Sequence, residues 1–156
     1  MILLPASIWD AALAALRTPP HDREQVAFLD GLELGEDAVV TTLTIPEAEQ
    51  AHGHYAISAQ EMTRAGLHLR ELGLIRIAQI HTHPGSWTGH SGHDDEFAYS
   101  QADGAVSIVA PHFAGTAPGL GDCSVHVRRE TGWKKLSAKK RKRTIKIVPS
   151  LIDLRA

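Results

Sequence analysis

The residues best suited to chemistry lie in one short stretch of the chain, where two histidines flank a single threonine. His81 and His83 close an apolar run that predicts a buried strand, and alternate residues of a strand point to the same face of a sheet. Asp94 stands three residues after Ser91, in the spacing of a helix N-cap and its first turn. Two neutral imidazoles, one carboxylate and an open position make up the ligand set of a catalytic zinc site. The stretch therefore predicts a metal centre held by the two histidines and the aspartate.

Further histidines and an aromatic residue accompany this stretch. His52 and His54 form a second His-x-His pair, but no helix-capping Ser/Asp pair follows it at a matching distance, so we assign it no metal. His90 and His93 crowd the motif, and loop histidines in such a place line the cleft, support the metal ligands from behind or face the solvent. Trp87 lies on the loop beside the metal ligands, where it either contacts a substrate or packs the loop. The histidines without a visible partner in the sequence are His21, His68, His112 and His126.

The pattern His-x-His-Pro, six residues and Ser-x-x-Asp resembles the signature of the JAMM zinc metalloproteases, also called JAB/MPN/Mov34 or MPN-plus. The resemblance extends over residues 20–136. It implies that His81, His83 and Asp94 hold one zinc ion per chain and that Ser91 helps to stabilise a tetrahedral intermediate. No His-Glu-x-x-His motif is present, so the common helical plan of zinc proteases is absent.

The same family uses a glutamate on an early strand, in the pattern Glu-x-x-Gly-hydrophobic-Leu-x-Gly. Glu24 begins the matching run Glu-Gln-Val-Ala-Phe-Leu-Asp-Gly, which ends at Gly31 and has alanine in place of the internal glycine. The resemblance implies that Glu24 takes a proton from a water molecule and delivers it to the leaving amine. Glu33 and Glu36, which flank a turn, and Glu61, which is typical of a capping box, compete for this role.

For function, the resemblance implies a deubiquitinase-like isopeptidase or peptidase that cleaves after the C-terminus of a ubiquitin-like protein, either a conjugate or a precursor. The chain lacks the long insertions of some eukaryotic members, and its strand at Ser107–Pro111 followed by Trp133 resembles the compact prokaryotic ones. Many of these belong with E1-like and E2-like proteins in bacterial conjugation pathways, several of them linked to antiviral (anti-phage) defence. A non-catalytic MPN scaffold and a hydrolase acting on a sulfur-carrier protein adduct stay open as alternatives.

Charge is divided unevenly along the chain. Residues 1–127 carry a net charge of −11, whereas residues 128–156 carry +9, and eight basic residues lie within Lys134–Lys146. This asymmetry indicates either a solvated surface or an acidic partner. We predict that Lys139–Arg143 steers an acidic protein partner during association. The run contains no interleaved aromatic residues, which disfavours nucleic acid as a partner.

Length and composition are those of one globular domain, with 156 residues of which 43% are hydrophobic and 22% are charged. The single cysteine, Cys123, excludes an intramolecular disulfide. Neither a signal-peptide core nor an apolar run of the ~20 residues that a membrane span needs is visible, which predicts a cytoplasmic protein without a membrane partner. We expect a JAMM/MPN-like domain over residues 1–136 and a basic C-terminal segment, residues 137–156, that packs on or extends it.

Helical and strand patterns alternate along the chain and predict an α/β (α+β) fold, a single MPN-like domain with a mixed central sheet flanked by helices. Helices are predicted over Ile8–Leu16 with Ser7 as the N-cap, over Ser58–Leu72 with Ser58 and Glu61 as a capping box, and over Ser91–Ala102. Strands are predicted over Glu24–Leu32, Val39–Ile45, Leu74–His83, Ala105–Ala110, Ser124–Arg129, Trp133–Leu136 and Thr144–Val148.

Overall fold

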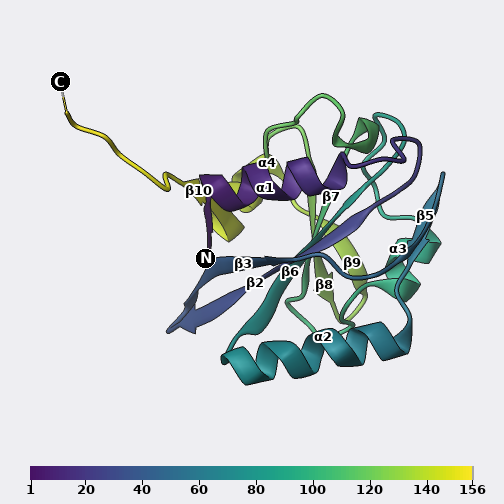
Figure 1. Cartoon of the computed structure of the whole chain (residues 1–156), viewed down its shortest axis with the longest axis horizontal. Coiled ribbons are helices and arrows are strands. Elements are labelled where there is room, and N and C mark those ends of the chain that lie inside the picture. Colours follow the sequence, from purple (N-terminus) through teal and green to yellow (C-terminus); the bar gives the residue numbers. More distant parts are fainter. Residues whose placement is uncertain (156) are drawn as a thin grey trace.

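The computed structural model describes residues 1–155, and its main feature is one curled sheet of eight strands with helices on both faces (Figure 1). In chain order the strands are β1 (Ile2–Pro5), β2 (Val26–Leu34), β3 (Asp37–Thr44), β4 (Glu49–Ala51), β5 (His54–Ala56), β6 (Ile75–Thr82), β7 (Val106–Ala110), β8 (Ser124–Arg129), β9 (Gly132–Lys135) and β10 (Ile145–Val148). The helices are α1 (Ala6–Leu16), α2 (Ala59–Leu72), α3 (Gly92–Phe97) and α4 (Ala138–Thr144), with a 3-10 turn η1 (His112–Ala114).

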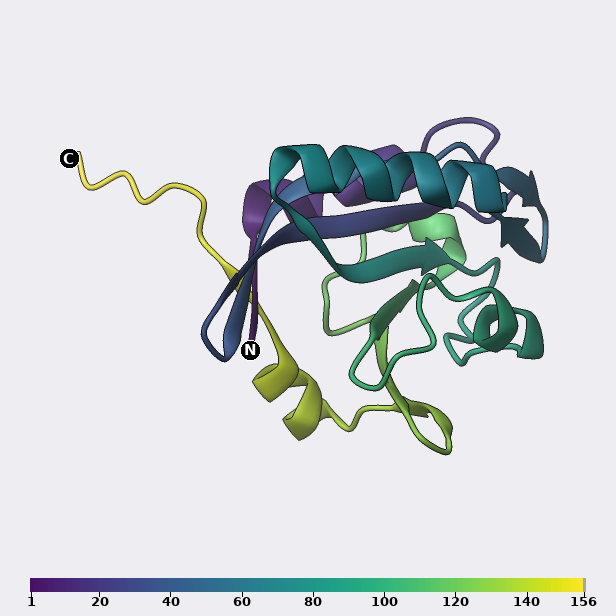
Figure 2. The same cartoon turned by 90° about the horizontal axis from the view of Figure 1, so that it is seen from below.

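The sheet combines local hairpins with long crossovers. Its strand order is β10-β1-β3-β2-β6-β7-β8-β9, and β4 and β5 form a separate hairpin. The pairs β10–β1, β1–β3 and β6–β7 are parallel, and the other pairs of the large sheet are antiparallel. The view from below shows α2 lying along the sheet, with α3 and α4 toward opposite ends of the molecule (Figure 2). This arrangement confirms the predicted fold class, a mixed sheet flanked by helices.

The two faces of the sheet are covered differently. On one face α1 packs Trp9 and Leu13 into the main hydrophobic core, which lies between that helix and the strands. On the other face a smaller cluster centred on Phe28 and Tyr55 packs against Met62 of α2. Strand residues alternate between the two faces, so β2 contributes to both clusters. The smaller apolar cluster leaves part of the second face to polar side chains, and the candidate site lies there.

The start of α1 differs from the prediction that Ser7 caps this helix. β1 runs directly into α1, Pro5 occupies the N-cap position, and no side chain of the preceding turn caps the helix. Ser7 lies in the first turn instead, and its N–H donates to Oγ of Ser150 at 2.8 Å. An orphan helix donor is therefore satisfied by a residue from the other end of the described chain, which no local pattern reveals.

The other differences concern short elements. The sequence predicts neither β1, β4 and β5 nor α4, because elements of three to seven residues show little periodicity. The helix predicted to extend from Ser91 to Ala102 ends at Phe97, since Ala98 adopts an extended backbone conformation. The following N–H, that of Tyr99, then donates to Oε1 of Gln79 at 3.0 Å. Within residues 1–155 no helix is long and apolar enough to cross a membrane.

Replacing Gly31 by alanine is expected to destabilise the fold. Gly31 lies at a register shift of the β2–β3 ladder, and an added Cβ would collide with the carbonyl oxygen of Val39 and lie 3.0 Å from Cδ1 of Ile77. Overpacking of this kind costs about 1–3 kcal/mol. Chemical denaturation should show that loss for Gly31→Ala. The control, Gly53→Ala, places its Cβ where nothing lies within 4 Å and should change the free energy of unfolding by less than about 0.5 kcal/mol.

Candidate metal centre

Three predicted ligand residues converge at the end of β6. His81 lies in β6 and His83 just beyond it, and both imidazoles reach the carboxylate of Asp94 in α3. Nε2 of His81 lies 3.3 Å from Oδ1 of Asp94, and Nε2 of His83 lies 3.2 Å from Oδ2. The two Nε2 atoms are 3.3 Å apart. All three side chains are buried, so the structure brings together the residues that the sequence singles out.

The spacing of these donor atoms fits a metal ion. Ligands bound tetrahedrally to zinc at about 2.0–2.2 Å are separated from one another by about 3.3–3.6 Å. The three donors of His81, His83 and Asp94 all lie within 4.8 Å of one another, and their nearest approaches match that separation. Nδ1 of His83 is held by the carbonyl oxygen of Trp87 at 3.1 Å, which orients Nε2 toward the site. The donor set and its geometry thus suit a divalent transition metal.

The start of α3 fixes the carboxylate. Ser91 is the N-cap, and its Oγ accepts the N–H of Asp94 at 3.1 Å. In return Oδ2 of Asp94 accepts the N–H of Ser91 at 2.6 Å, which completes a capping box. The predicted helix cap is therefore confirmed, and it holds the aspartate in one rotamer. The hydroxyl proton of Ser91 is not used by this box and can be donated elsewhere.

The titration of the three side chains reflects their mutual contact. Burial alone would raise the pKa of Asp94, but hydrogen bonds from His81 and His83 hold that pKa far below its ordinary value. Burial lowers the pKa of His81. For His83 the desolvation is outweighed by the hydrogen bond and charge of Asp94, and its pKa is raised. The carboxylate is consequently ionised and available as a ligand.

Glu24 reaches the site through strand pairing. β2 is antiparallel to β6 with Val26 opposite His81, and Glu24 lies two residues before Val26. Its N–H donates to the carbonyl oxygen of Ala51 at 2.8 Å, and only 3% of the residue is exposed. Burial raises the pKa of Glu24 to about 7, an effect that the charge of His83 opposes and that of Asp94 reinforces. A carboxylate with such a pKa is suited to accept and return a proton near neutral pH.

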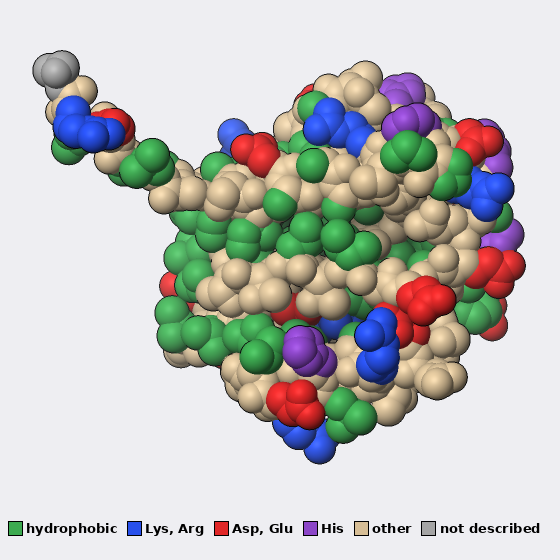
Figure 3. Space-filling model, viewed as in Figure 1, with side chains coloured by type: hydrophobic (Ala, Val, Ile, Leu, Met, Phe, Trp, Pro, Cys, Tyr) green, Lys and Arg blue, Asp and Glu red, His purple; other side chains and the backbone are tan. Residues whose placement is uncertain are grey.

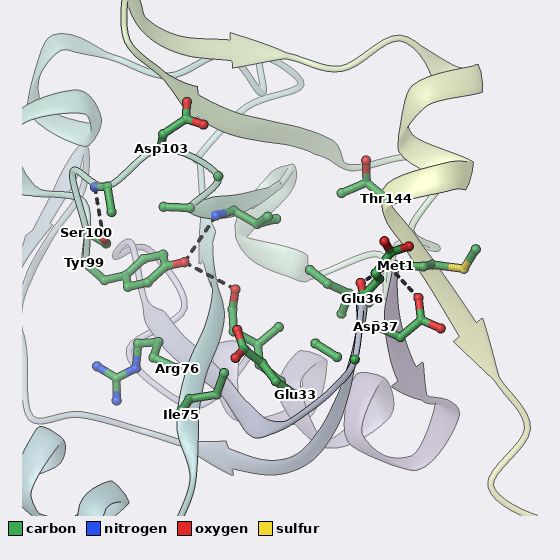
Figure 4. A pocket seen from close by; sticks show the side chains of 18 residues that line it. Met1, Glu33, Glu36, Asp37, Ile75, Arg76, Tyr99, Ser100, Asp103 and Thr144 are labelled. Carbon is green, nitrogen blue, oxygen red and sulfur yellow. Dashed lines mark hydrogen bonds and ion pairs between the residues drawn. The ribbon is translucent and has the colours of Figure 1, made fainter.

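The competing glutamates lie elsewhere. Glu33 and Glu36 line a pocket beside Met1 and Tyr99, at the turn between β2 and β3 (Figure 4). Glu33 lies nine residues after Glu24, most of them in β2, which is a span of up to about 30 Å in an extended chain. The carboxylate of Glu61 binds the N–H of Glu47 and the guanidinium of Arg64. Of the candidate glutamates, only Glu24 approaches the metal ligands.

Glu61 also forms less of a capping box than the sequence predicts. Oγ of Ser58 accepts the N–H of Glu61 at 3.1 Å, as expected for an N-cap. The glutamate carboxylate, however, turns to Glu47 and Arg64 instead of returning to the N–H of Ser58. The bond from the N–H of Glu47, in the loop before β4, and the bonds from Arg64, on α2 itself, therefore replace the expected bond from the N–H of Ser58.

Trp87 packs against one of the predicted ligands and is also partly open to solvent. Its ring stacks on that of His83, with centroids 5.2 Å apart and an interplanar angle of 17°. Its carbonyl oxygen meanwhile holds Nδ1 of the same histidine. The residue is still 59% exposed, so one face of the indole is open beside the site.

His90 lies behind the predicted ligands, which is one of the places that the sequence leaves open for it, whereas the contact of His126 with it has no visible signal in the local motif. Nδ1 of His90 lies 3.0 Å from Oδ1 of Asp95, and its Nε2 lies 3.0 Å from Oγ of Ser107, so the imidazole joins α3 to β7. Its ring stacks on that of His126 at 4.2 Å, and burial lowers the pKa of His126 to about 3. The available signal was the occurrence of polar residues at alternate positions of otherwise apolar strands, at Gln79, Ser107 and His126.

The remaining histidines lie outside the group of predicted ligands. His54 and His93 face each other with ring centroids 5.2 Å apart, and His52 contacts Phe113. His68 lies on α2, where it faces Glu71 at 3.7 Å. Figure 3 shows that most histidines visible from this side gather at the end of the molecule that carries α3 and β5.

Comparison with known proteins finds a relative that is named as a metalloprotease. A protein of Sinorhizobium fredii named probable metalloprotease y4jG is 30% identical over 118 residues, which is 72% of this chain and 72% of that protein. No family model matches the chain.

Solved structures share the fold. The solution structure of the protein DSY2949 from Desulfitobacterium hafniense matches with a TM-score of 0.73 at 18% identity, over 97% of this chain and 95% of the other. The crystal structure of a JAB1/MPN domain protein from Archaeoglobus fulgidus matches with a TM-score of 0.51 at 12% identity, over 87% of this chain and 94% of the other.

Removal of both imidazoles is expected to abolish tight metal binding. The double variant His81→Ala/His83→Ala leaves one carboxylate, which is too few ligands for a transition-metal ion. Elemental analysis after dialysis should find about one equivalent of metal in the unaltered protein and less than about a tenth in the variant. His52→Ala/His54→Ala, which alters the other His-x-His pair, should keep the full equivalent. Equal metal contents in the two double variants would contradict the assignment.

Proposed function

Since the chain belongs to the JAMM/MPN family of metalloproteases, we propose that it is a zinc-dependent peptidase that cleaves after the C-terminus of a ubiquitin-like protein. The observation that carries the proposal is the convergence of two imidazoles and a carboxylate with the buried, proton-accepting Glu24 beside them. A non-catalytic scaffold protein of this fold would need neither a cluster of metal-binding side chains nor a buried glutamate beside it. The relative and the fold indicate a metallopeptidase. The identity of the metal, zinc, and the identity of the substrate, a ubiquitin-like protein, are our proposal.

His81, His83 and Asp94 would hold the ion. A zinc ion bound by them would lower the pKa of a water and polarise a carbonyl group. Glu24 accepts a proton from the attacking water and returns it to the nitrogen of the leaving amine. The hydroxyl of Ser91 donates to the oxygen on which negative charge develops, because its other contacts leave that proton free. The reaction is hydrolysis of an amide or isopeptide bond.

The surroundings of the site suit an extended chain. β4 and β5 form a two-stranded hairpin, and β5, which contacts α3, has no further strand paired to its outer edge among the described residues. An extended Gly-Gly tail can add to such an edge through main-chain hydrogen bonds. Glycines also pass close to the exposed ring of Trp87 without a side-chain clash. These features support an extended ubiquitin-like tail as the substrate. A bacterial conjugation pathway with E1-like and E2-like proteins, in defence against phage, is the setting that we propose for it.

Glu24→Gln is expected to keep the fold and the metal and to lose turnover. The amide is nearly isosteric but cannot accept a proton, and loss of general acid–base catalysis lowers rates by about 10²–10⁴-fold. Metal content, circular dichroism and kcat would be measured together. Glu33→Gln, at the other end of β2, is the matched control and should leave kcat unchanged. Undiminished hydrolysis by Glu24→Gln would remove the residue from the mechanism.

The substrate class can be tested with fusions of a ubiquitin-like protein. The zinc-loaded protein is expected to cut a reporter peptide from such a protein immediately after Gly-Gly, with the cut site read by mass spectrometry. A fusion ending in Pro-Pro, which lacks free main-chain donors, should be cut at least about tenfold more slowly. Equal cleavage of both fusions, or of an unrelated unfolded peptide, would indicate a peptidase without this specificity.

A further inference from the structure

The basic helix α4 buries none of its own side chains. Its seven residues include the run Lys139–Arg143, so like charges face each other at i,i+4 spacing. Isolated helices shorter than about 12–15 residues are marginal in water. Ser137 caps α4, and Nη1 of Arg141 donates to the carbonyl oxygens of Gly121 at 3.0 Å and Cys123 at 3.2 Å. These contacts fix the helix in place, while Lys139, Lys140, Lys142 and Arg143 stay exposed.

The positive charge of this region is not balanced within the chain. Among the residues that the structure describes, the ion pairs include no basic side chain of Lys134–Lys146. Residues 1–127 carry a net charge of −11, yet no carboxylate approaches these side chains within 4.0 Å. An excess of one sign on an exposed helix favours a binding partner of the opposite sign.

An apolar groove lies directly beside α4. Leu120, Ile145 and Ile147 form its apolar lining, and Arg141, Lys142 and Lys146 supply the basic lining, around a volume of about 420 Å³. Ile145 is buried, and the other two apolar side chains are half-buried. The volume is large enough for an aliphatic or aromatic side chain from outside. A partner can therefore bury an apolar side chain in the groove as well as pair its charges with the basic side chains around it.

This surface lies away from the metal centre. α4 and α3 lie toward opposite ends of the molecule in both views (Figures 1 and 2). The groove also belongs to the face covered by α1, since Leu120 and Ile147 pack against the main core. A partner bound at α4 would leave the metal centre open.

We propose that α4 and this groove bind an acidic segment of a partner protein, which places one apolar side chain in the groove and its carboxylates against Lys139, Lys140, Lys142 and Arg143. The apolar lining favours a peptide over a nucleic acid, because phosphates cannot fill it and the residues that line it include no aromatic ring to stack on a base. The interaction is independent of peptide hydrolysis.

The probe is a fluorescein-labelled synthetic peptide of Asp and Glu residues around a central Leu-Phe pair, and binding is followed by anisotropy. We expect saturable binding that weakens at least tenfold when Leu-Phe is replaced by Ser-Ser. Affinity should also fall as salt is raised from 0.05 to 0.3 M, because screening shortens the reach of the charges. Binding should be the same for metal-loaded and metal-stripped protein, which separates this surface from the proposed peptidase site.

Two variants test the surface itself. Replacing Lys139, Lys140, Lys142 and Arg143 by Ser removes the charge but keeps Arg141, which fixes the helix. Gly121→Leu fills the groove from a position where an added Cβ meets only Arg141, at 3.8 Å. Each should weaken peptide binding at least tenfold with unchanged thermal unfolding. The charge-matched control, which replaces four exposed arginines elsewhere by Ser, should change binding less than twofold; these are Arg23, Arg70, Arg129 and Arg155.

Several results would overturn the proposal. Absence of saturable peptide binding, or loss of binding on metal removal, would contradict it directly. Equal binding of the Leu-Phe and Ser-Ser peptides would remove the groove from the interaction. Tighter binding of duplex DNA, with displacement of the peptide, would assign the surface to nucleic acid. The exposed side chains of Leu151, Ile152 and Leu154 could instead fill the groove of a second copy of the chain. A dimer in sedimentation that dissociates when residues 151–156 are deleted would assign the groove to that second copy.

Discussion

The structure depends on holding one ionised carboxylate, that of Asp94, inside the protein. An unpaired buried charge costs several kcal/mol, so each polar group around it must contribute a contact. The imidazoles of His81 and His83 approach its two oxygens, and the N–H of Ser91 donates to Oδ2. This requirement determines where α3 begins relative to the end of β6. The helix N-terminus adds its own favourable field for the negative charge.

The same requirement makes one face of the sheet polar. Nε2 of Gln79 donates to Oη of Tyr55 and to Oγ of Ser107, both at 3.1 Å, and its Oε1 accepts the N–H of Tyr99. Ser107 then contacts His90, which reaches α3 through Asp95. A buried polar side chain without a hydrogen-bond partner would destabilise the fold, whereas a connected network of hydrogen bonds holds the side chains in a single arrangement. The metal centre is thus positioned by polar contacts, whereas the α1 face is held by apolar packing.

The functional groups are distributed over two ends of the molecule. Residues 1–127 contribute the candidate metal centre and Glu24, and residues 128–156 contribute α4, β9 and β10. The groove beside α4 is lined from both parts, by Leu120 and Gly121 and by residues of α4 and β10. β10 joins the large sheet through its parallel pairing with β1, with Ile2 opposite Ile145. The position of α4 is therefore fixed by strand pairing between the two ends of the chain and by Arg141. The proposed peptidase chemistry and the proposed partner binding are therefore assigned to separate parts of the fold.

The sequence by itself determined the parts of the site that are local. Alternation along β6 put His81 and His83 on one face, and Ser91 and Asp94 capped a helix, because period-two geometry and capping act over a few residues. The helix α2 followed in the same way from its N-cap, Ser58.

The resemblance indicated Glu24 and left Glu33, Glu36 and Glu61 as competitors. The tertiary structure placed Glu24 beside the predicted ligands, because its position depends on the pairing of β2 with β6 across more than fifty residues. It also decided that His90 joins α3 to β7, that Ser150 completes α1, and that α4 lies next to an apolar groove. Contacts between distant segments are selected by packing and by the satisfaction of buried polar groups, and neither leaves a periodic pattern in the sequence.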